Sequence, residues 1–258
     1  NSHVPGGAPP GSGTAAWSAG LGQAGPEMIA LDWPPWYRST HHACTQSTPP
    51  GAGQHPWAKY APCMAENEIE PPLLGVAWDG TGYGDDGTIW GGEFFLVEKD
   101  SCRRAAHFRT FRLPGGDAAV REPRRSSLGL LHEIFGEDFW ERKEWLRDFT
   151  PPEANTLRTM LTKQVNSPLT SSAGRLFDGV AALAGLRSHS TFEGQAAMEL
   201  EFALDPATTE SYPFALRAGP PLVIAWEPAL RAPLAARAPK IPTAKHAARS
   251  HTTHRDRA

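Results

Sequence analysis

One segment narrows the fold more than any other: an apolar run, then a glycine-rich stretch, then a second apolar run. Residues 73–78 (LLGVAW) are nearly all apolar, as in a strand buried on both faces. Residues 79–87 (DGTGYGDDG) have the composition of a turn, and residues 88–97 (TIWGGEFFLV) indicate the returning strand. Residues 102–113 roughly alternate apolar and basic side chains. The sequence therefore predicts a three-stranded meander.

The glycine-rich stretch has two interpretations. Glycine lets a backbone approach an anion closely, and successive exposed N–H groups bind phosphate oxygens. Asp79, at the end of the first strand, would then lie beside a cation or a metal-bound water. The same residues suit an ordinary hairpin turn, and spacing alone favours the turn. The stretch is neither a Walker loop nor a GxGxxG element.

Helical patterns follow the meander. Hydrophobic spacing predicts helices over residues 122–135, 138–149, 171–186 and 193–202, and a final short strand over residues 222–226. The pair Pro151 and Pro152 is expected to end the second helix.

The start of the helix over residues 171–186 is a second candidate anion site. Small residues precede the helix, and the free N–H groups of a helix N-terminus attract anions. Asp178 lies one turn after Gly174, so it can face the same side and accept hydrogen bonds from sugar hydroxyls. Taken alone, these residues favour the simpler interpretation of a helix cap with a solvated Asp.

Composition excludes several classes of function. A net charge of −3 lacks the basic excess of proteins that bind nucleic acid or anionic membranes, and no apolar run is long enough to span a bilayer. Three cysteines without a CxxC pair favour the reducing cytoplasm over a disulfide framework. Residues 1–25 and 231–258 are rich in proline and small or basic residues, which predicts disordered termini.

Several long segments together resemble the carbamoyl-transfer domain of the hydrogenase-maturation carbamoyltransferases, the HypF family. In family order they are residues 73–98 (LLGVAWDGTGYGDDGTIWGGEFFLVE), 111–125 (FRLPGGDAAVREPRR), 166–186 (NSPLTSSAGRLFDGVAALAGL), 191–201 (TFEGQAAMELE) and 212–228 (YPFALRAGPPLVIAWEP). Residues 26–40 (PEMIALDWPPWYRST) and 64–70 (MAENEIE) resemble upstream blocks of the same domain. Ordered motifs of this length are far more specific than a single short pattern.

The resemblance implies an α/β fold: part of an actin-like ATPase (ribonuclease H-like) lobe, with a β-meander followed by helices between disordered termini. Residues 26–70 would be a remnant of the first lobe with a degraded metal motif. Residues 71–230 would be the second lobe, incomplete at its C-terminal end. The chain is therefore expected to be a fragment of a longer enzyme and inactive in isolation.

The resemblance also implies a chemistry. In the family, carbamoyl phosphate and ATP yield carbamoyl-adenylate, and this domain passes the carbamoyl group to the C-terminal cysteine thiolate of a HypE-type partner. By this likeness, phosphate would be held by Asp79, Gly80, Thr81 and Gly82. The nucleoside would be contacted by Gly174, Asp178 and Glu193. The alternative is an inactive remnant that binds a nucleotide or a partner without transferring the carbamoyl group.

One motif departs from the family. The family carries two histidines, four residues apart, that bind a divalent metal such as iron or zinc before the MAEN block. Here His55 matches the first ligand, and Lys59 stands at the second position. A lysine ammonium has no lone pair at neutral pH and repels a cation. We therefore expect metal binding at His55 to be lost or much weakened, with Asp79 as a further candidate ligand.

Overall fold

The computed structural model describes residues 29–32, 50–53, 63–64, 66–99, 101–203 and 212–235. The chain divides into two units, Asn1–Ala61 and Pro62–Ala258. In the first unit, β1 (Ile29–Asp32) and β2 (Pro50–Gly53) form a two-stranded parallel sheet. The predicted disorder of residues 1–25 lies outside the described residues.

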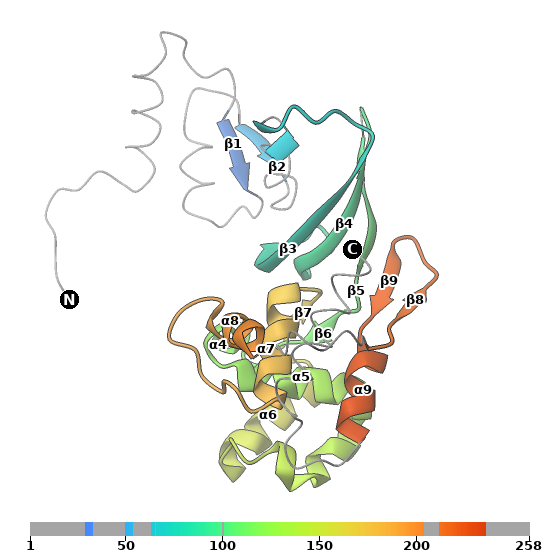
Figure 1. Ribbon diagram of the computed structural model, residues 1–258. Helices are drawn as coiled ribbons and strands as arrows, with labels where there is room; N and C mark the ends of the chain where they lie inside the picture. Colours follow the sequence, from blue (N-terminus) through green and yellow to red (C-terminus); the bar gives the residue numbers. More distant parts are fainter. Residues whose placement is uncertain are drawn as a thin grey trace, which may run out of the picture. The chain divides into compact units, whose positions relative to one another are not determined.

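The second unit is built on a seven-stranded mixed sheet. Its strands are β3 (Leu73–Tyr83), β4 (Ile89–Val97), β5 (Cys102–Phe108), β6 (Phe111–Arg112), β7 (Leu169–Thr170), β8 (Ala215–Arg217) and β9 (Leu222–Ala225). The long strands β3, β4 and β5 pair antiparallel in chain order, which confirms the predicted meander (Figure 1). β7 and β9, from much later in the chain, pair in parallel with β4 and β5.

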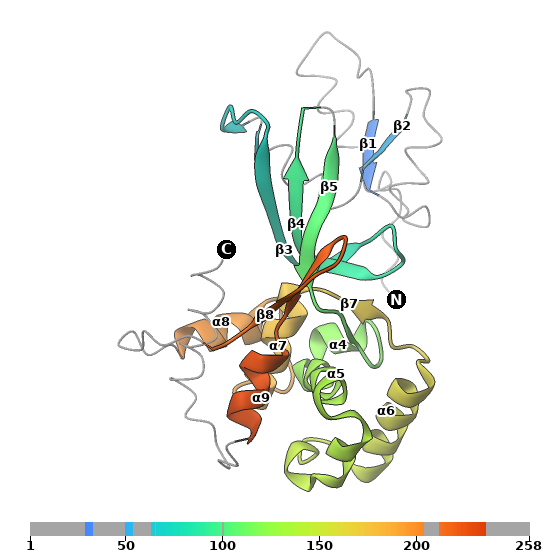
Figure 2. The same ribbon diagram turned by 90° about the vertical axis from the view of Figure 1, so that its right-hand side faces the viewer.

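Helices gather at one end of the three long strands (Figure 2). They are α4 (Ala118–Arg121), α5 (Pro123–Phe135), α6 (Pro151–Lys163), α7 (Ala173–Leu183), α8 (Gln195–Phe202) and α9 (Glu227–Ala235), with 3₁₀ turns over Gly136–Glu141 and Lys143–Trp145. The helices predicted over residues 122–135, 171–186 and 193–202 are confirmed as α5, α7 and α8. The strand predicted over residues 222–226 is confirmed as β9.

The region around residue 150 corrects the sequence prediction. Two 3₁₀ turns replace the helix expected over residues 138–149, and the two prolines begin α6 instead of ending a helix. Thr150 caps α6 in a capping box: its amide donates to Glu153 (2.8 Å), and its hydroxyl accepts from the Glu153 amide. Proline suits the first turn of a helix because the amide it lacks has no partner there.

The meander also differs from the prediction in two respects. Residues 79–83 belong to β3, and the turn is confined to residues 84–88, where the amide of Gly84 donates to the carbonyl of Thr88 (2.9 Å). β3 is buried on one face only: Leu74 and Val76 are exposed, while Ala77 is buried. An antiparallel edge strand needs only one covered face, so its apolar run did not indicate burial on both.

The C-terminal boundary lies further along the chain than predicted. α9 continues to Ala235, and Leu234 is buried in the main core, so helical structure extends past residue 230. The rest of the predicted tail lies outside the described residues. Within the described part of the chain, no helix is long and apolar enough to cross a membrane.

The core places α7 where it can support a site. α5 lies at the centre of the core, with Leu128, Leu130 and Leu131 fully buried. α7 packs on α5 at Gly179, where an added Cβ atom would lie 2.5 Å from the Leu130 side chain. α7 also contacts β3 and β4. The N-terminus of α7 is thereby fixed against the glycine-rich part of β3.

Candidate functional site

A bulge in β3 forms one wall of the site. Trp78 pairs with Gly92 and Gly82 pairs with Trp90, so residues 79–81 together face the single residue Gly91. A Cβ atom on Gly91 would lie 2.5 Å from the carbonyl oxygen of Asp79, so only glycine fits there. Extra residues in one strand release backbone from the ladder and bend it. The glycine-rich stretch therefore forms a strand irregularity in addition to the turn at residues 84–88, and its binding of an anion stays a prediction.

The N-terminus of α7 docks onto this bulge. Ser172 caps the helix: its hydroxyl accepts a hydrogen bond from the amide of Arg175 (3.1 Å). The same hydroxyl lies 2.7 Å from the carbonyl oxygen of Asp79 and 2.8 Å from that of Gly80, to which it donates. A Cβ atom on Gly174 would lie only 2.9 Å from the Cα atom of Gly80. The two segments predicted to bind anions are thus in direct contact.

Charged side chains converge at the same point. The guanidinium of Arg175 lies 2.9 Å from the carboxylate of Asp178, and the two side chains are only 3% and 4% exposed. A Cβ atom on Gly80 would lie 3.2 Å from Nη2 of Arg175 and 3.2 Å from Oε1 of Glu193. The bulge, the start of α7 and the segment before α8 therefore meet in one site.

Asp178 has an unusual acidity. Burial raises the pKa of its carboxyl, the charge of Arg175 lowers it and the charge of Glu193 raises it; the pKa that results is about 6 instead of 3.8. The folded protein therefore binds this proton more tightly than the unfolded chain does. The resulting stabilisation is complete below about pH 4 and is lost as the pH rises through 6.

We expect Asp178→Asn to remove this pH dependence. Between pH 4 and pH 6 the wild type should lose about 2 kcal/mol of its free energy of unfolding relative to the variant, since one pKa unit corresponds to about 1.4 kcal/mol. Urea unfolding of both proteins across this range measures the difference and cancels groups that titrate identically in both. A difference that stays constant with pH would contradict the assignment.

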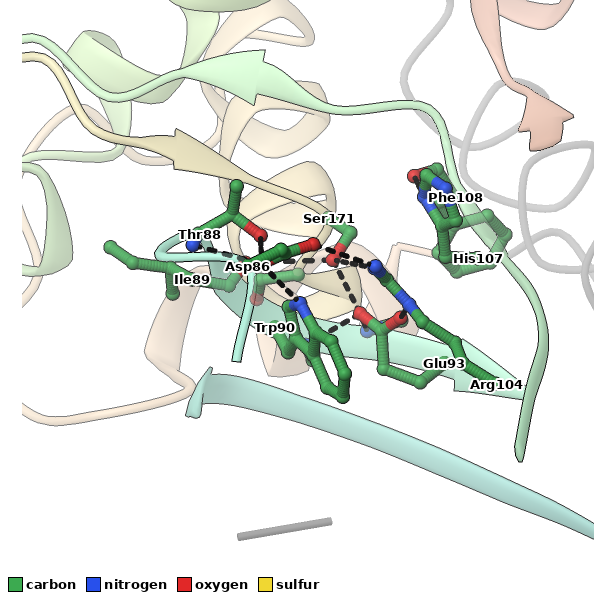
Figure 3. Close-up of polar contacts among 12 residues, drawn as sticks. Asp86, Thr88, Ile89, Trp90, Glu93, Arg104, His107, Phe108 and Ser171 are labelled. Atoms are coloured by element: carbon green, nitrogen blue, oxygen red, sulfur yellow. Dashed lines mark hydrogen bonds and ion pairs between the residues drawn. The ribbon is translucent and has the colours of Figure 1, made fainter. Parts of the chain in front are cut away.

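A second polar network stabilises the surrounding strands (Figure 3). Glu93 of β4 is fully buried, and its carboxylate accepts hydrogen bonds from the amides of Gly91 and Gly92, from the Ser171 hydroxyl and from Nε of Arg104 (2.5 Å). Arg104 also pairs with Asp86 (2.9 Å) in the turn. The network joins the turn and β4 to Ser171, which precedes the α7 cap.

The structure unites most of the predicted site residues but leaves some aside. Asp79, Gly80, Gly174 and Asp178 meet as described, together with Glu193. Thr81 lies on the bulge, and Gly82 lies beyond it, paired with Trp90. His55 and Lys59 lie outside the described residues, so the expected loss of metal binding stays a prediction. Within the residues that are described, no three His, Cys, Asp or Glu side chains group as metal ligands.

Sequence reasoning missed four polar residues of this region: Ser172, Arg175, Glu93 and Arg104. Ser172 and Arg175 belong to the motif in which Gly174 and Asp178 were recognised. Glu93 had a visible signal, because it is the one charged residue in residues 88–97. A charge in a run of apolar strand residues indicates a buried partner.

Comparison with known proteins decides the family. The family model described as "Carbamoyltransferase, Kae1-like Domain, second subdomain" matches residues 75–256. The chain belongs to the HypF carbamoyltransferase family. This confirms the family expected from the motifs, and with it membership of a transferase family.

Curated relatives agree with the HypF assignment. Carbamoyltransferase HypF of Synechocystis is 41% identical over 224 residues, which cover 80% of this chain and 29% of the relative. Carbamoyltransferase HypF of Rhizobium leguminosarum is 37% identical over 180 residues, which cover 68% of this chain and 23% of the relative. The chain thus spans less than a third of the length of these HypF proteins.

Solved HypF structures share the fold. A crystal structure of full-length HypF in its phosphate- and nucleotide-bound form matches with a TM-score of 0.84 and 31% identity, over 93% of this chain and 31% of that one. HypF of T. kodakarensis matches with a TM-score of 0.75 and 29% identity, over 88% of this chain and 30% of that one. These matches confirm the predicted α/β fold.

Proposed function

We propose that this chain supplies the adenylate-binding part of a hydrogenase-maturation carbamoyltransferase. The observation that carries the proposal is the direct contact between the β3 bulge at Gly80 and the α7 N-terminus at Gly174. Helix N-termini and glycine-rich backbone both favour phosphate. The resemblance of a phosphate- and nucleotide-bound HypF supports the same ligand class.

In this proposal each side of the site holds one part of carbamoyl-adenylate, which is formed from carbamoyl phosphate and ATP. The backbone at residues 79–82 binds the phosphate; a phosphate oxygen replaces the carboxylate of Asp79 that now accepts from the Gly80 amide (2.7 Å). Asp178 and Glu193 accept hydrogen bonds from the ribose hydroxyls. Gly174 leaves room for this close approach of backbone to ligand.

The transfer step follows from holding the adenylate in place. A cysteine thiolate at the C-terminus of a HypE-type partner attacks the carbamoyl carbon, a C–S bond forms, the C–O bond to phosphate breaks, and AMP leaves. The thiocarbamate so formed is the intermediate of hydrogenase maturation. Because this chain spans 29% of the length of the Synechocystis relative, we assign to it binding and orientation, with turnover in the complete enzyme. A cytoplasmic location is part of the proposal.

Calorimetry tests the binding function. We expect saturable one-to-one binding of ATP and AMP to the chain. Glu193→Gln should weaken this binding, because its carboxylate lies in the site. The matched control Glu201→Gln, which changes an exposed carboxylate on α8, should not. Absence of nucleotide binding to the wild-type chain, or equal losses in both variants, would refute the proposal.

The alternative is a remnant that binds nucleotide but does not transfer the carbamoyl group. A transfer assay distinguishes it from an active carbamoyltransferase. The remnant is favoured by Lys59, which stands where the family has the second of its two metal-binding histidines. The chain is incubated with carbamoyl phosphate, ATP and a peptide ending in the partner's cysteine, and mass spectrometry detects a carbamoylated thiol. We expect no product from the chain alone. Product formation would assign the complete transfer to this segment.

A further inference from the structure

Arg175 combines burial with unsatisfied hydrogen-bond donors. The residue is 2% exposed. Within the described residues, neither Nε nor Nη1 of its guanidinium has a hydrogen-bond acceptor, and Oδ2 of Asp178 has no donor. A buried charged group without hydrogen bonds is unfavourable, and native proteins rarely keep one without a purpose. The donors of Arg175 therefore indicate a ligand.

The contact between Arg175 and Asp178 is an ion pair only. Nη1 and Oδ2 are 2.9 Å apart, yet their orientation is not that of a hydrogen bond. A guanidinium forms its strongest contacts as two parallel N–H···O bonds with a carboxylate or a phosphate. Asp178 leaves this capacity unused, so a better acceptor can replace it.

The surroundings of Arg175 favour a phosphate as that acceptor. Its Nη2 atom lies against Gly80, next to the N-terminus of α7, and both the helix end and the guanidinium attract anions. The carboxylates of Asp178 and Glu193 face the same region and would repel a phosphate. A cation must offset that repulsion, and Arg175 is the cationic side chain that the fold places against Gly80.

We propose that Arg175 binds the nucleotide phosphate and that its ion pair with Asp178 is a latch that the ligand opens. The phosphate takes over the guanidinium, and the released carboxylate of Asp178 turns to the ribose hydroxyls. The site thus exchanges one internal ion pair for two contacts to the ligand. This inference rests on the proposed nucleotide site and adds the residue that selects for phosphate.

The test compares AMP with adenosine, which differ only in the phosphate. Calorimetry is run on wild type, Arg175→Met, Arg175→Lys and the matched control Arg158→Met, which removes an exposed arginine paired with Glu137. We expect Arg175→Met to lose about 10- to 100-fold in AMP affinity, as for a lost charged hydrogen bond, with adenosine affinity unchanged within about threefold. Arg175→Lys keeps the charge without the fork and should lose less. Arg158→Met should bind as wild type does.

A measurement on the unaltered protein keeps the inference testable if the variants do not fold. The Nε–H resonance of Arg175, assigned in ¹⁵N-labelled wild type, should shift with AMP and with inorganic phosphate but not with adenosine. Equal losses of AMP and adenosine affinity in Arg175→Met, or no loss, would overturn the latch while leaving the nucleotide site intact. Wild type that binds neither AMP nor ATP would overturn both proposals.

Discussion

Replacing Gly174 by Ala should lower the affinity for ATP and AMP by about 10- to 100-fold, since an extra carbon in a packed site costs about 1–3 kcal/mol and each 1.4 kcal/mol is tenfold in affinity. The added Cβ atom would lie 2.9 Å from the Cα atom of Gly80 and 3.2 Å from the carbonyl oxygen of Asp79. Both neighbours are backbone atoms, so no side-chain rotation relieves the clash. The helix and the bulge must separate, and the proposed phosphate site opens.

The higher helix propensity of Ala opposes the loss of nucleotide affinity in Gly174→Ala, so a loss would come from the clash and not from a weaker helix. Ala favours a helix interior over Gly by about 1 kcal/mol, and Gly174 is the second residue of α7, so helix propensity does not by itself disfavour the substitution. Gly179→Ala is the matched control, because it makes the same change on the same helix but directs the Cβ atom at Leu130 of α5 (2.5 Å). We expect Gly179→Ala to lower the melting temperature and keep nucleotide affinity. Gly174→Ala binding nucleotide as wild type does would contradict the contact.

Hydrophobic spacing and turn residues were enough to predict the β-meander and α7. The meander follows from apolar runs separated by turn residues, and α7 follows from an apolar stripe that begins after Ser172. The prolines at residues 151 and 152 misled, because the same residues can end one helix or begin the next. Only the box formed by Thr150 and Glu153 distinguishes these cases, and it places them at the start of α6.

The site was predicted in its parts but not in its assembly. Gly80 and Gly174 drew notice because glycine permits close approach, yet their mutual contact depends on how β3 and α7 pack. Arg175 was not predicted, because the feature that singles it out is a buried guanidinium whose Nε and Nη1 donors have no acceptor among the described residues. The sequence does not show which donors become buried without an acceptor, because that depends on the packing of the folded chain. The family resemblance suggested the ligand that we propose, and the packing adds Arg175 to the proposed site.

The buried carboxylate of Glu93 should be the most sensitive group of the polar network. Glu93→Gln keeps the shape of the side chain but removes its charge, and it directs either an amide donor or a neutral oxygen at Arg104. We expect a loss of about 3 kcal/mol in the free energy of unfolding, as for removal of one partner of a buried ion pair. Urea denaturation measures it. Glu98→Gln is the matched control, because Glu98 is an exposed carboxylate on the same hairpin that accepts a hydrogen bond from the Ser101 hydroxyl (2.9 Å). This substitution should change the free energy of unfolding by less than about 0.5 kcal/mol.

A double variant shows whether the loss comes from the pair itself. Arg104→Met removes the charge that Glu93 neutralises, and Arg104→Met with Glu93→Gln removes both charges together. Because an unpaired buried charge accounts for most of each single loss, the double variant should be less destabilised than the sum of the two by at least about 1 kcal/mol. Strict additivity would show that Glu93 acts through the amides of Gly91 and Gly92 and through Ser171 rather than through Arg104. A double variant less destabilised than the sum would show that the ion pair between Glu93 and Arg104 joins β4 to β5 next to Ser171 and the α7 cap, beside the proposed phosphate site.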